Sequence, residues 1–385
     1  MVDNYKRLLQ LPNGGEETFF LWGPRQTGKS TLLRQTYPHA IWVDLLKPEE
    51  FRRYISHPEH LREELQADSK NRFVVIDEVQ KVPGILDEVQ YLHELYGIQF
   101  ALCGSSARKL KHGNANMLGG RAIRYELNGF SLAELPKDYV LNDFLNRGYL
   151  PRFAMSNAAT RLQHSYVANY LKEEIASEGL VRNLPSFSEF LNIAALSDTE
   201  TVNYTNIARD VGLSADTVKN YFEILTDTML GRFVQSYRRR PKRRISVAPK
   251  FYFSDVGVVN VLTRRGHIAT GTSDFGKAFE NWVFHELNSY NLYRERFADI
   301  HYWRLSTGVE VDFIINHIDV AIEVKSSDRI HSGHLKGLIQ LLEDHPETKR
   351  RVVVCSEPKY RQTSEGIDIM PFRYFLEALW NGDLF

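Results

Sequence analysis

The sequence is poor in cysteine and lacks the spacings that mark a zinc site or a disulfide framework. Its two cysteines, Cys103 and Cys355, each lie inside an apolar, strand-like run, as core thiols in a reducing compartment do. A disulfide-stabilised scaffold is therefore not expected. The 13 histidines include no His-x-x-x-His spacing, and no Cys-x-x-Cys pair occurs, so a zinc site is not expected either.

Long apolar runs and an excess of charge of one sign are also missing. No apolar run approaches the roughly 18 residues that a membrane span needs, and Met1–Pro12 lacks the apolar stretch of a secretory signal. We therefore expect a cytoplasmic protein with no membrane partner. The 48 basic residues balance the 48 acidic ones, so contact with nucleic acid would depend on local patches. A length of 385 residues predicts two or three domains.

The first part of the chain has the pattern of an α/β domain. From Thr18 to Leu135, short apolar runs alternate with amphipathic stretches, which is typical of a parallel sheet with crossover helices. The expected strands are Thr18–Trp22, Ala40–Asp44, Arg72–Asp77, Ile98–Cys103 and Ala122–Leu127, and the clearest helices are Lys29–Thr36 and Ile85–Tyr96. Such a series predicts a complete nucleotide-binding sheet. The following segment, from Ser131 to about Leu196, is expected to be helical.

A phosphate-binding loop is the most specific motif in the sequence. Residues 23–30 match G-x-x-x-x-G-K-[ST] in full, between an expected strand and an expected helix. Glycines let successive backbone N–H groups point at phosphate oxygens, and the helix N-terminus adds partial positive charge. Lys29 would bind the β- and γ-phosphates of ATP, and the Ser30 hydroxyl would bind Mg²⁺. The predicted ATP-binding residues of this loop are Gly23, Pro24, Arg25, Gln26, Thr27, Gly28, Lys29, Ser30 and Thr31.

A second motif supplies the carboxylates that ATP hydrolysis needs. The apolar strand Arg72–Asp77 ends in Asp77 and is followed by Glu78. Asp77 would contribute to binding Mg²⁺ and the nucleotide, and Glu78 would act as the general base that polarises the attacking water. A carboxylate base next to the strand end points to hydrolysis and not merely to nucleotide-dependent switching.

Three further residues have more than one interpretation. Ser105 or Ser106, after the next strand, is a candidate sensor of the γ-phosphate, or else an N-cap for the helix that follows. Arg121 could stabilise negative charge in the transition state, either in its own chain or, in an oligomer, on a neighbouring subunit. Alternatively, Arg121 is an ordinary surface arginine.

These motifs together resemble the prokaryotic AAA-type ATPases that carry a C-terminal domain of unknown function. The resemblance rests on Gly23–Ser30, Asp77–Pro83, Gly104–Ser106 and Leu118–Arg121, and it covers nearly the whole chain. It implies an AAA-type P-loop ATPase domain at residues 1–135 and a helical lid with a winged helix at residues 136–250. It also implies that residues 251–385 form an α/β restriction-endonuclease-like domain, similar to PD-(D/E)xK nucleases.

The middle of the chain contains a helix-turn-helix pattern. Residues 204–211 and 215–225 have helical apolar spacing, Gly212 lies in the turn and Ser214 can cap the second helix. The second helix offers Lys219 and Asn220 for DNA, but also Asp216 and Glu223. A basic run at residues 238–244 would suit the wing of a winged helix and would bind phosphates. The alternative is a winged helix that contacts protein.

Two strand patterns near the C-terminus bring carboxylates together. Residues 309–315 and 320–325 would form a hairpin whose loop has two or four residues. Either loop length pairs Ile315 with Val320, and therefore places Asp312 opposite Glu323. Opposed like charges need compensation, which a divalent cation would supply.

By resemblance to PD-(D/E)xK nucleases, Asp312 and Glu323 would bind Mg²⁺ or Mn²⁺, and Lys325 would orient the water or stabilise the phosphate. Glu280, on an expected helix, could be a third ligand. Nuclease folds are also used for binding alone, so cleavage is a separate question.

The leading hypothesis from the sequence is an ATPase that acts on DNA through the winged helix and the nuclease-like domain. A rival is a regulatory or remodelling ATPase that binds a protein partner and carries a catalytically inactive nuclease-like domain. A third interpretation is a nucleotide-gated DNA-binding regulator without nuclease activity.

Overall fold

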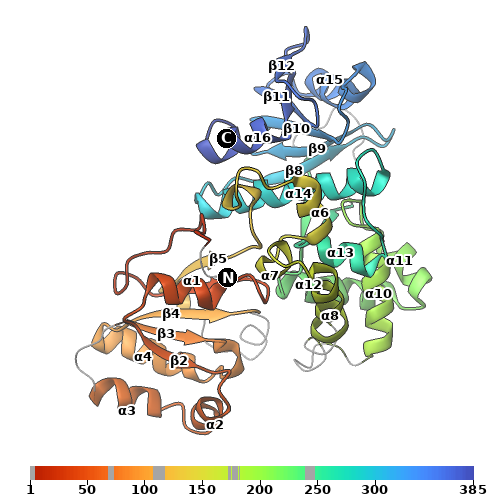
Figure 1. Cartoon of the computed structure of the whole chain (residues 1–385). Coiled ribbons are helices and arrows are strands. Elements are labelled where there is room, and N and C mark those ends of the chain that lie inside the picture. The colour runs from red at the N-terminus through yellow and green to blue at the C-terminus, as the bar shows by residue number, and fades with distance from the viewer. Residues whose placement is uncertain are drawn as a thin grey trace. The chain divides into compact units, whose positions relative to one another are not determined.

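The computed structural model describes residues 5–67, 73–106, 118–171, 175, 181, 183–238 and 248–385 (Figure 1). The chain divides into two compact units. The first comprises Met1–Gly129 together with Ile224–Leu230, and the second comprises Phe130–Glu223 and Gly231–Phe385. None of the helices in the described ranges is both long and apolar enough to cross a membrane.

The first unit contains a five-stranded sheet in the order β2-β3-β4-β1-β5. All four neighbouring pairs of strands are parallel. The strands are β1 (Phe19–Trp22), β2 (Ile41–Asp44), β3 (Phe73–Asp77), β4 (Gln99–Gly104) and β5 (Ile123–Glu126). Each lies where the sequence predicts it, with ends that differ by at most one residue; Arg72 lies outside the described residues.

Helices pack against this sheet through apolar side chains. They are α1 (Lys29–Thr36), α2 (Pro48–Ser56), α3 (His60–Ala67) and α4 (Ile85–Tyr96), with short 3₁₀ turns at Val79–Lys81 (η1) and Leu118–Gly120 (η2). The bounds predicted for α1 and α4 are confirmed. Ile85, Val89 and Leu92 of α4 lie at helical spacing and pack in one core with Ile76 and Leu102 of the sheet. Burial of each such side chain contributes about 1.5–3 kcal/mol.

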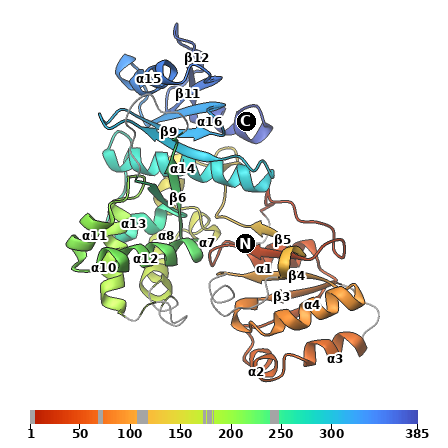
Figure 2. The ribbon, with the colours of Figure 1, turned by 180° about the vertical axis from the view of Figure 1, so that it is seen from behind.

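The second unit begins with helices, as the sequence predicts for this segment. They are α6 (Leu141–Arg147), α7 (Pro151–Ala154), α8 (Ala159–Ser165), η4 (Tyr166–Leu171) and α10 (Leu184–Leu196), after a 3₁₀ turn at Leu132–Glu134 (η3). Further along the chain, α13 (Val256–Leu262) and the long helix α14 (Ser273–Tyr293) belong to the same unit. Figure 2 shows α14 beside the strands of the second sheet.

The helix-turn-helix pattern corresponds to α11 (Tyr204–Val211) and α12 (Ala215–Asp227). Gly212 has φ 65°, the left-handed conformation that glycine adopts without strain. Ser214 accepts a hydrogen bond from Thr217 N at 3.1 Å and so caps α12. Strands β6 (Gly231–Ser236) and β7 (Lys250–Phe253) follow as an antiparallel pair. The basic run at 238–244 lies outside the described residues except for Arg238.

An eight-stranded mixed sheet completes the second unit, in the order β12-β13-β11-β10-β9-β8-β6-β7. Its remaining members are β8 (Ile300–Arg304), β9 (Glu310–Ile315), β10 (Val320–Lys325), β11 (Arg350–Cys355), β12 (Arg361–Gln362) and β13 (Asp368–Pro371). A 3₁₀ turn at Ser332–Leu335 (η5) and helix α15 (Lys336–Asp344) lie between β10 and β11 in sequence, and helix α16 (Phe372–Asn381) follows β13. In the antiparallel β9–β10 pair Ile315 lies opposite Val320, which confirms the predicted register.

Candidate functional site

The phosphate-binding loop connects the end of β1 at Trp22 to the start of α1 at Lys29. Gly28 has φ 91°, which a residue with a side chain rarely adopts. At Gly23 a Cβ atom would lie only 2.3 Å from Leu127 O, so the neighbouring chain leaves no room for a side chain. The two fixed glycines of the motif are therefore required by the backbone geometry of the loop.

Lys29 is buried and turned back over the loop. Its Nζ donates to Gly23 O at 2.7 Å and to Pro24 O at 3.0 Å. The Thr27 hydroxyl also donates to Pro24 O, at 2.9 Å, and stabilises the turn of the loop. The Lys29 ammonium group is thus hydrogen-bonded to two neutral carbonyl oxygens. These two contacts do not neutralise its positive charge.

A pocket of about 210 Å³ opens at the loop. Its lining brings part of the predicted ATP-binding loop together with Glu78, the predicted general base, and does not include Gly23, Pro24 or Thr27. The lining residues are Arg25, Gln26, Gly28, Lys29, Ser30, Thr31, Leu46 and Glu78. Asp77 ends β3 directly beside this lining, and the Glu78 N–H donates to Asp77 Oδ1 at 3.1 Å.

Glu78 belongs to a buried polar network that sequence reasoning did not identify in full. Gln80 Nε2 donates to Glu78 Oε2 at 2.5 Å and to Ser105 Oγ at 3.0 Å. The Ser105 hydroxyl lies 3.4 Å from the same Glu78 oxygen. Glu78 has φ 58°, an uncommon conformation for a residue with a side chain that often occurs at functional sites.

The parallel pairing of β3 and β4 explains why these residues meet. Asp77 lies opposite Cys103, so the segments that follow both strands leave the sheet at the same edge. Ser105, predicted as a γ-phosphate sensor, therefore lies beside Glu78, the predicted general base. Its alternative role as an N-cap concerns a segment outside the described residues. Gln80 lies in the Asp77–Pro83 motif, but the sequence analysis assigned it no role, because the motif does not show which side chain its amide meets.

Arg121 lies at the opposite edge of the sheet from the loop. Phe19 of β1 lies opposite Ile123 of β5, so Arg121 precedes β5 at the edge where β1 begins, whereas the loop follows the end of β1. Arg121 Nε contacts Glu94 Oε1 at 2.9 Å. The interpretation in which Arg121 contacts the phosphates of its own chain is wrong for this reason, and a role on a neighbouring subunit stays a prediction.

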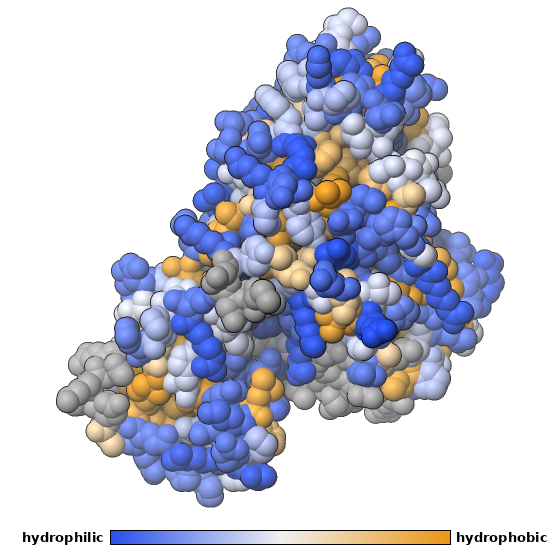
Figure 3. Space-filling view, in the orientation of Figure 1, coloured by the Kyte–Doolittle hydropathy of each residue, from blue (hydrophilic) through white to orange (hydrophobic). Residues whose placement is uncertain are grey.

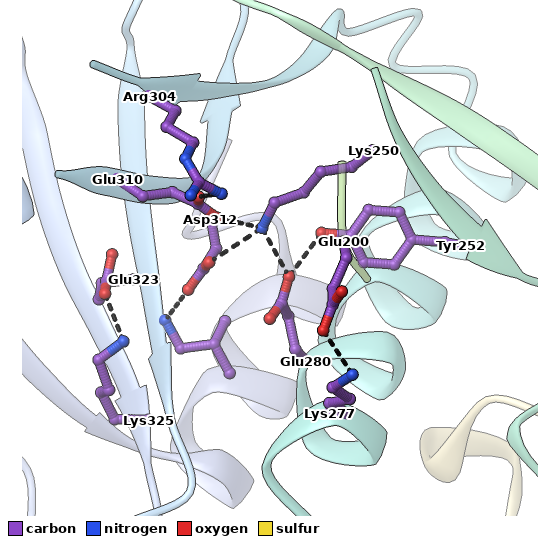
Figure 4. A network of polar contacts seen from close by, with 11 residues as sticks. Glu200, Lys250, Tyr252, Lys277, Glu280, Arg304, Glu310, Asp312, Glu323 and Lys325 are labelled. Carbon is purple, nitrogen blue, oxygen red and sulfur yellow. Dashed lines mark hydrogen bonds and ion pairs between the residues drawn. The ribbon is translucent and has the colours of Figure 1, made fainter. Parts of the chain in front are cut away.

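The C-terminal carboxylates surround a lysine that the sequence analysis did not consider (Figure 4). Lys250, the first residue of β7, is 2% exposed. Its Nζ lies 3.0 Å from Glu280 Oε1 and 3.4 Å from Asp312 Oδ1, and it also contacts Glu310. Burial lowers the pKa of Lys250, but the charges of these carboxylates and of Tyr252 together raise it well above its usual value.

The neighbouring hydrogen bonds hold the same carboxylates in place. The Tyr252 hydroxyl donates to Glu280 Oε1 at 2.7 Å, and Val324 N donates to Asp312 Oδ2 at 2.8 Å. The Val324 contact agrees with the predicted proximity of Asp312 and Glu323. Glu323 itself is paired with Lys325, whose Nζ lies 2.5 Å from Glu323 Oε1. Burial, followed by the charge of Asp312, raises the pKa of Glu323 to about 8.

These contacts do not fit the predicted divalent cation site. Glu280 and Asp312 face the ammonium group of Lys250, and Glu323 faces that of Lys325, so two lysines supply the compensation that the sequence analysis assigned to Mg²⁺ or Mn²⁺. Within the described ranges, no group of three or more acidic, histidine or cysteine side chains is arranged to hold a metal ion. In this geometry Lys325 is paired with Glu323, and its predicted catalytic role stays a prediction.

Three family models match consecutive parts of the chain. Residues 15–136 match a family described as AAA domain. Residues 139–268 and 275–375 match two families described as domains of unknown function, DUF8612 and DUF4143.

Curated relatives are distant and themselves described as uncharacterized. A protein of Mycobacterium tuberculosis is 23% identical over 304 residues, which cover 77% of this chain and 66% of the relative, and a Mycobacterium bovis protein matches equally. A Haemophilus influenzae protein is 22% identical over 331 residues, with coverages of 80% and 78%. The chain thus spans less than two thirds of the length of its mycobacterial relatives.

Two solved structures are also similar. Domain III of the replication initiation protein DnaA from Thermotoga maritima has 15% identity and a TM-score of 0.23, covering 56% of this chain and 85% of that chain. A signal transduction ATPase with a tetratricopeptide repeat sensor from Pyrococcus horikoshii has 12% identity and a TM-score of 0.22, covering 90% and 53%. The AAA match over residues 15–136 and the geometry of the loop support an AAA-type P-loop ATPase domain in this part of the chain, and with it ATP binding and hydrolysis.

Proposed function

We propose that this chain hydrolyses ATP with Lys29 as the phosphate-binding cation and Glu78 as the general base. The observation that carries this proposal is the pocket in which Lys29, Ser30 and Glu78 meet. The Lys29 ammonium and the backbone N–H groups at the start of α1 would bind the phosphate oxygens. The Glu78 carboxylate, which lines the same pocket, would accept a proton from the attacking water.

The residues at the strand end suit Mg²⁺ as well. The Ser30 hydroxyl and the Asp77 carboxylate offer the oxygen donors that this ion prefers, and Asp77 lies beside Glu78 at the end of β3. Ser30 and Asp77 would hold the ion, which neutralises charge on the phosphates when it is bound.

ATP turnover of two variants tests the proposal. In Lys29→Ala both binding and turnover of ATP should be lost, whereas Glu78→Gln should bind ATP but turn it over at least about a hundredfold more slowly. Lys6→Ala removes an exposed lysine of the same unit and serves as the matched control. Unchanged turnover in Lys29→Ala would refute the site.

For the second unit we infer a binding role without metal-dependent cleavage. The support is Lys250, whose ammonium group lies among Glu280, Glu310 and Asp312. This arrangement favours a regulatory or remodelling ATPase with an inactive nuclease-like domain over a nuclease. Purified protein should leave linear and plasmid DNA intact with either Mg²⁺ or Mn²⁺. Cleavage that depends on metal and disappears in Lys325→Ala would contradict this inference.

DNA and protein remain competing partners of the helix-turn-helix segment. Lys219 and Asn220 on α12 are exposed and favour DNA, but Asp216 and Glu223 on the same helix are exposed too and repel phosphates. Fluorescence anisotropy with duplex DNA at 50 to 200 mM salt separates the two, because phosphate contacts weaken steeply over this range. Salt-sensitive binding supports a DNA-binding regulator, and no binding at the lowest salt supports a protein partner.

A further inference from the structure

Arg7, in the segment before β1, bonds three backbone carbonyls of the first unit. Its Nη1 donates to Thr27 O at 2.7 Å, and its Nη2 donates to Asn128 O at 2.8 Å and to Gly129 O at 3.1 Å. Hydrophilic side chains cover much of the visible face of the protein in Figure 3, where charged groups can bond water. Arg7 is instead half-buried, and these bonds hold its guanidinium group against the main chain.

The segment that carries Arg7 is itself anchored to the first unit. Leu9 is buried, and the hydroxyl of Tyr37, directly after α1, donates to Pro12 O. The Arg7 side chain therefore starts from a fixed point of the chain. Its planar guanidinium group presents several N–H donors in a fork, so it can bond two separate stretches of backbone at once. The orientation of this group is thus set by the residues on both sides of it.

The bond to Thr27 O determines the direction of the N–H group that follows. The Thr27 carbonyl and the Gly28 N–H belong to one trans peptide unit, so they point in opposite directions. Because Arg7 bonds the carbonyl, the Gly28 N–H points away from the guanidinium group. Gly28 lines the pocket at the phosphate-binding loop, whereas Thr27 is fully buried and does not line it. Arg7 therefore holds this peptide by its carbonyl end.

Two physical effects of this contact favour anion binding at Gly28. A hydrogen bond from a cation to a carbonyl oxygen polarises the peptide, which makes its N–H a stronger donor. Glycine also has the greatest backbone freedom of any residue, and Gly28 has φ 91°. Fixing the peptide before this glycine removes alternative loop conformations and so reduces the entropic cost of ligand binding.

We propose that Arg7 is a positioning residue of the ATP site, which holds the Thr27–Gly28 peptide with its N–H directed at the phosphates. This inference rests on the function proposed above for the site. The Gly28 N–H would donate to a phosphate oxygen that ATP and ADP share, because the N–H groups of such a loop bind the α- and β-phosphates. The lining of the pocket does not include Arg7, so Arg7 acts through the peptide and not by contact with the nucleotide.

Calorimetric titration of the full chain with ADP tests the proposal. Arg7→Ala should weaken ADP binding at least about tenfold, since a peptide that is no longer held loses its bond to the phosphate. Arg7→Lys keeps a cation that can bond Thr27 O but lacks the planar fork, so its loss should be smaller, about threefold. Lys6→Ala removes the exposed neighbouring lysine and should leave ADP binding unchanged.

Steady-state ATP turnover separates positioning from a loss of folded structure. In Arg7→Ala the KM should rise by about the same factor as the Kd for ADP, whereas kcat should stay within about threefold of the wild type. The reason is that Glu78 is unchanged and that the Gly28 N–H bonds the phosphate in both the ground state and the transition state. Partial unfolding would instead lower kcat and leave KM unchanged.

Three results would overturn the proposal. These are an ADP affinity of Arg7→Ala within about twofold of the wild type, an equal loss in Lys6→Ala, or a lower kcat with unchanged KM. Should Arg7→Ala fail to fold, Arg7→Lys decides the question, because wild-type ADP affinity in that variant would exclude the role.

Lys29→Ala distinguishes this failure from failure of the ATP site. If ADP binding is lost in Lys29→Ala but kept in Arg7→Ala, only the role of Arg7 is wrong. If ADP binding is unchanged in both variants, the proposed ATP site itself is wrong.

Discussion

The side-chain amide of Gln80 donates to Glu78 Oε2 at 2.5 Å, so the proposed general base is already hydrogen-bonded in the structure. A donor at this oxygen competes with the attacking water for the carboxylate and reduces its basicity. Gln80 is buried and also bonds Ser105, which fixes the amide in this orientation. ATP hydrolysis therefore requires either a second lone pair of Glu78 or release of this contact.

We expect Gln80→Met to raise basal ATP turnover about three- to tenfold. Methionine has a similar size but cannot donate, and one hydrogen bond of about 1 kcal/mol corresponds to a rate change of this order. The steady-state rate at saturating ATP measures the effect. Gln90→Met is the control, because Gln90 donates to Glu94 on the surface of α4 at 2.7 Å. A fall in turnover with unchanged KM would mean that Gln80 positions Glu78 productively.

Lys250 is expected to be essential for the stability of the second unit. The Lys250→Met variant removes the cation that is shared by three carboxylates, those of Glu280, Glu310 and Asp312. Breaking a buried ion pair costs about 3–5 kcal/mol. Urea unfolding monitored by tryptophan fluorescence measures this loss. Lys277→Met, which removes the more exposed pair with Glu200, should cost less than about 1 kcal/mol. Equal losses in both variants would argue against a special role of Lys250.

The position of Lys250 among the carboxylates also predicts that the wild type and Lys250→Ala respond differently to Mn²⁺. If the Lys250 ammonium takes the place of a divalent cation, Mn²⁺ should raise the melting temperature of Lys250→Ala but leave that of the wild type unchanged, both without nucleotide. The shift in Lys250→Ala should disappear when Asp312→Asn is added, because Asp312 is one of the carboxylates set free. A comparable Mn²⁺ shift in the wild type, abolished by Asp312→Asn, would contradict the assignment.

The free energy of unfolding should fall as the pH rises from about 4 to about 7. Burial raises the pKa of Asp198 from 3.8 to about 7, despite hydrogen bonds from Phe253 N and Asn281 Nδ2. Because the folded state then binds the proton more tightly than the unfolded state, the stability is greatest at low pH. The stability then decreases as the pH rises to the pKa of Asp198 in the folded state. This group accounts for up to about 4 kcal/mol of the decrease.

Urea unfolding of Asp198→Asn at several pH values isolates this contribution. The variant should have a shallower decrease between pH 4 and 7 than the wild type, whatever its absolute stability. Asp138→Asn changes an exposed aspartate of the same unit and should keep the slope of the wild type. Identical slopes in Asp198→Asn and the wild type would mean that Asp198 titrates normally.

Gly23→Ala should impair the ATP site through the backbone alone. A Cβ atom would lie 2.3 Å from Leu127 O and 3.2 Å from Thr27 Oγ1, so the loop has to move. We expect ATP affinity to fall at least tenfold and stability to fall by about 1–3 kcal/mol. In Gly84→Ala the nearest atom is Pro58 Cγ at 3.7 Å, so this control should stay within about 0.5 kcal/mol of wild type. Unchanged ATP affinity in Gly23→Ala would show that the loop tolerates a side chain.

The sequence by itself determined the features that depend on local backbone chemistry and on periodicity. The loop from Gly23 to Ser30 is recognisable because the glycines and the lysine that define it lie close together in the sequence, directly before and at the start of α1. The strand ending at Asp77 is recognisable because a buried parallel strand is continuously apolar. The pairing of Ile315 with Val320 followed from hairpin geometry, in which loop length and side-chain alternation leave one register.

Only the tertiary structure decided which distant side chains meet. Gln80 reaches Ser105 because β3 and β4 are neighbours in the sheet order, and Arg121 is separated from the loop because β5 runs parallel to β1. Lys250 lies 30 residues before Glu280 and 62 before Asp312, and no local pattern joins them. A charge in a strand pattern indicates a polar position, but whether a metal ion or a lysine neutralises a buried carboxylate depends on packing between elements far apart in the chain.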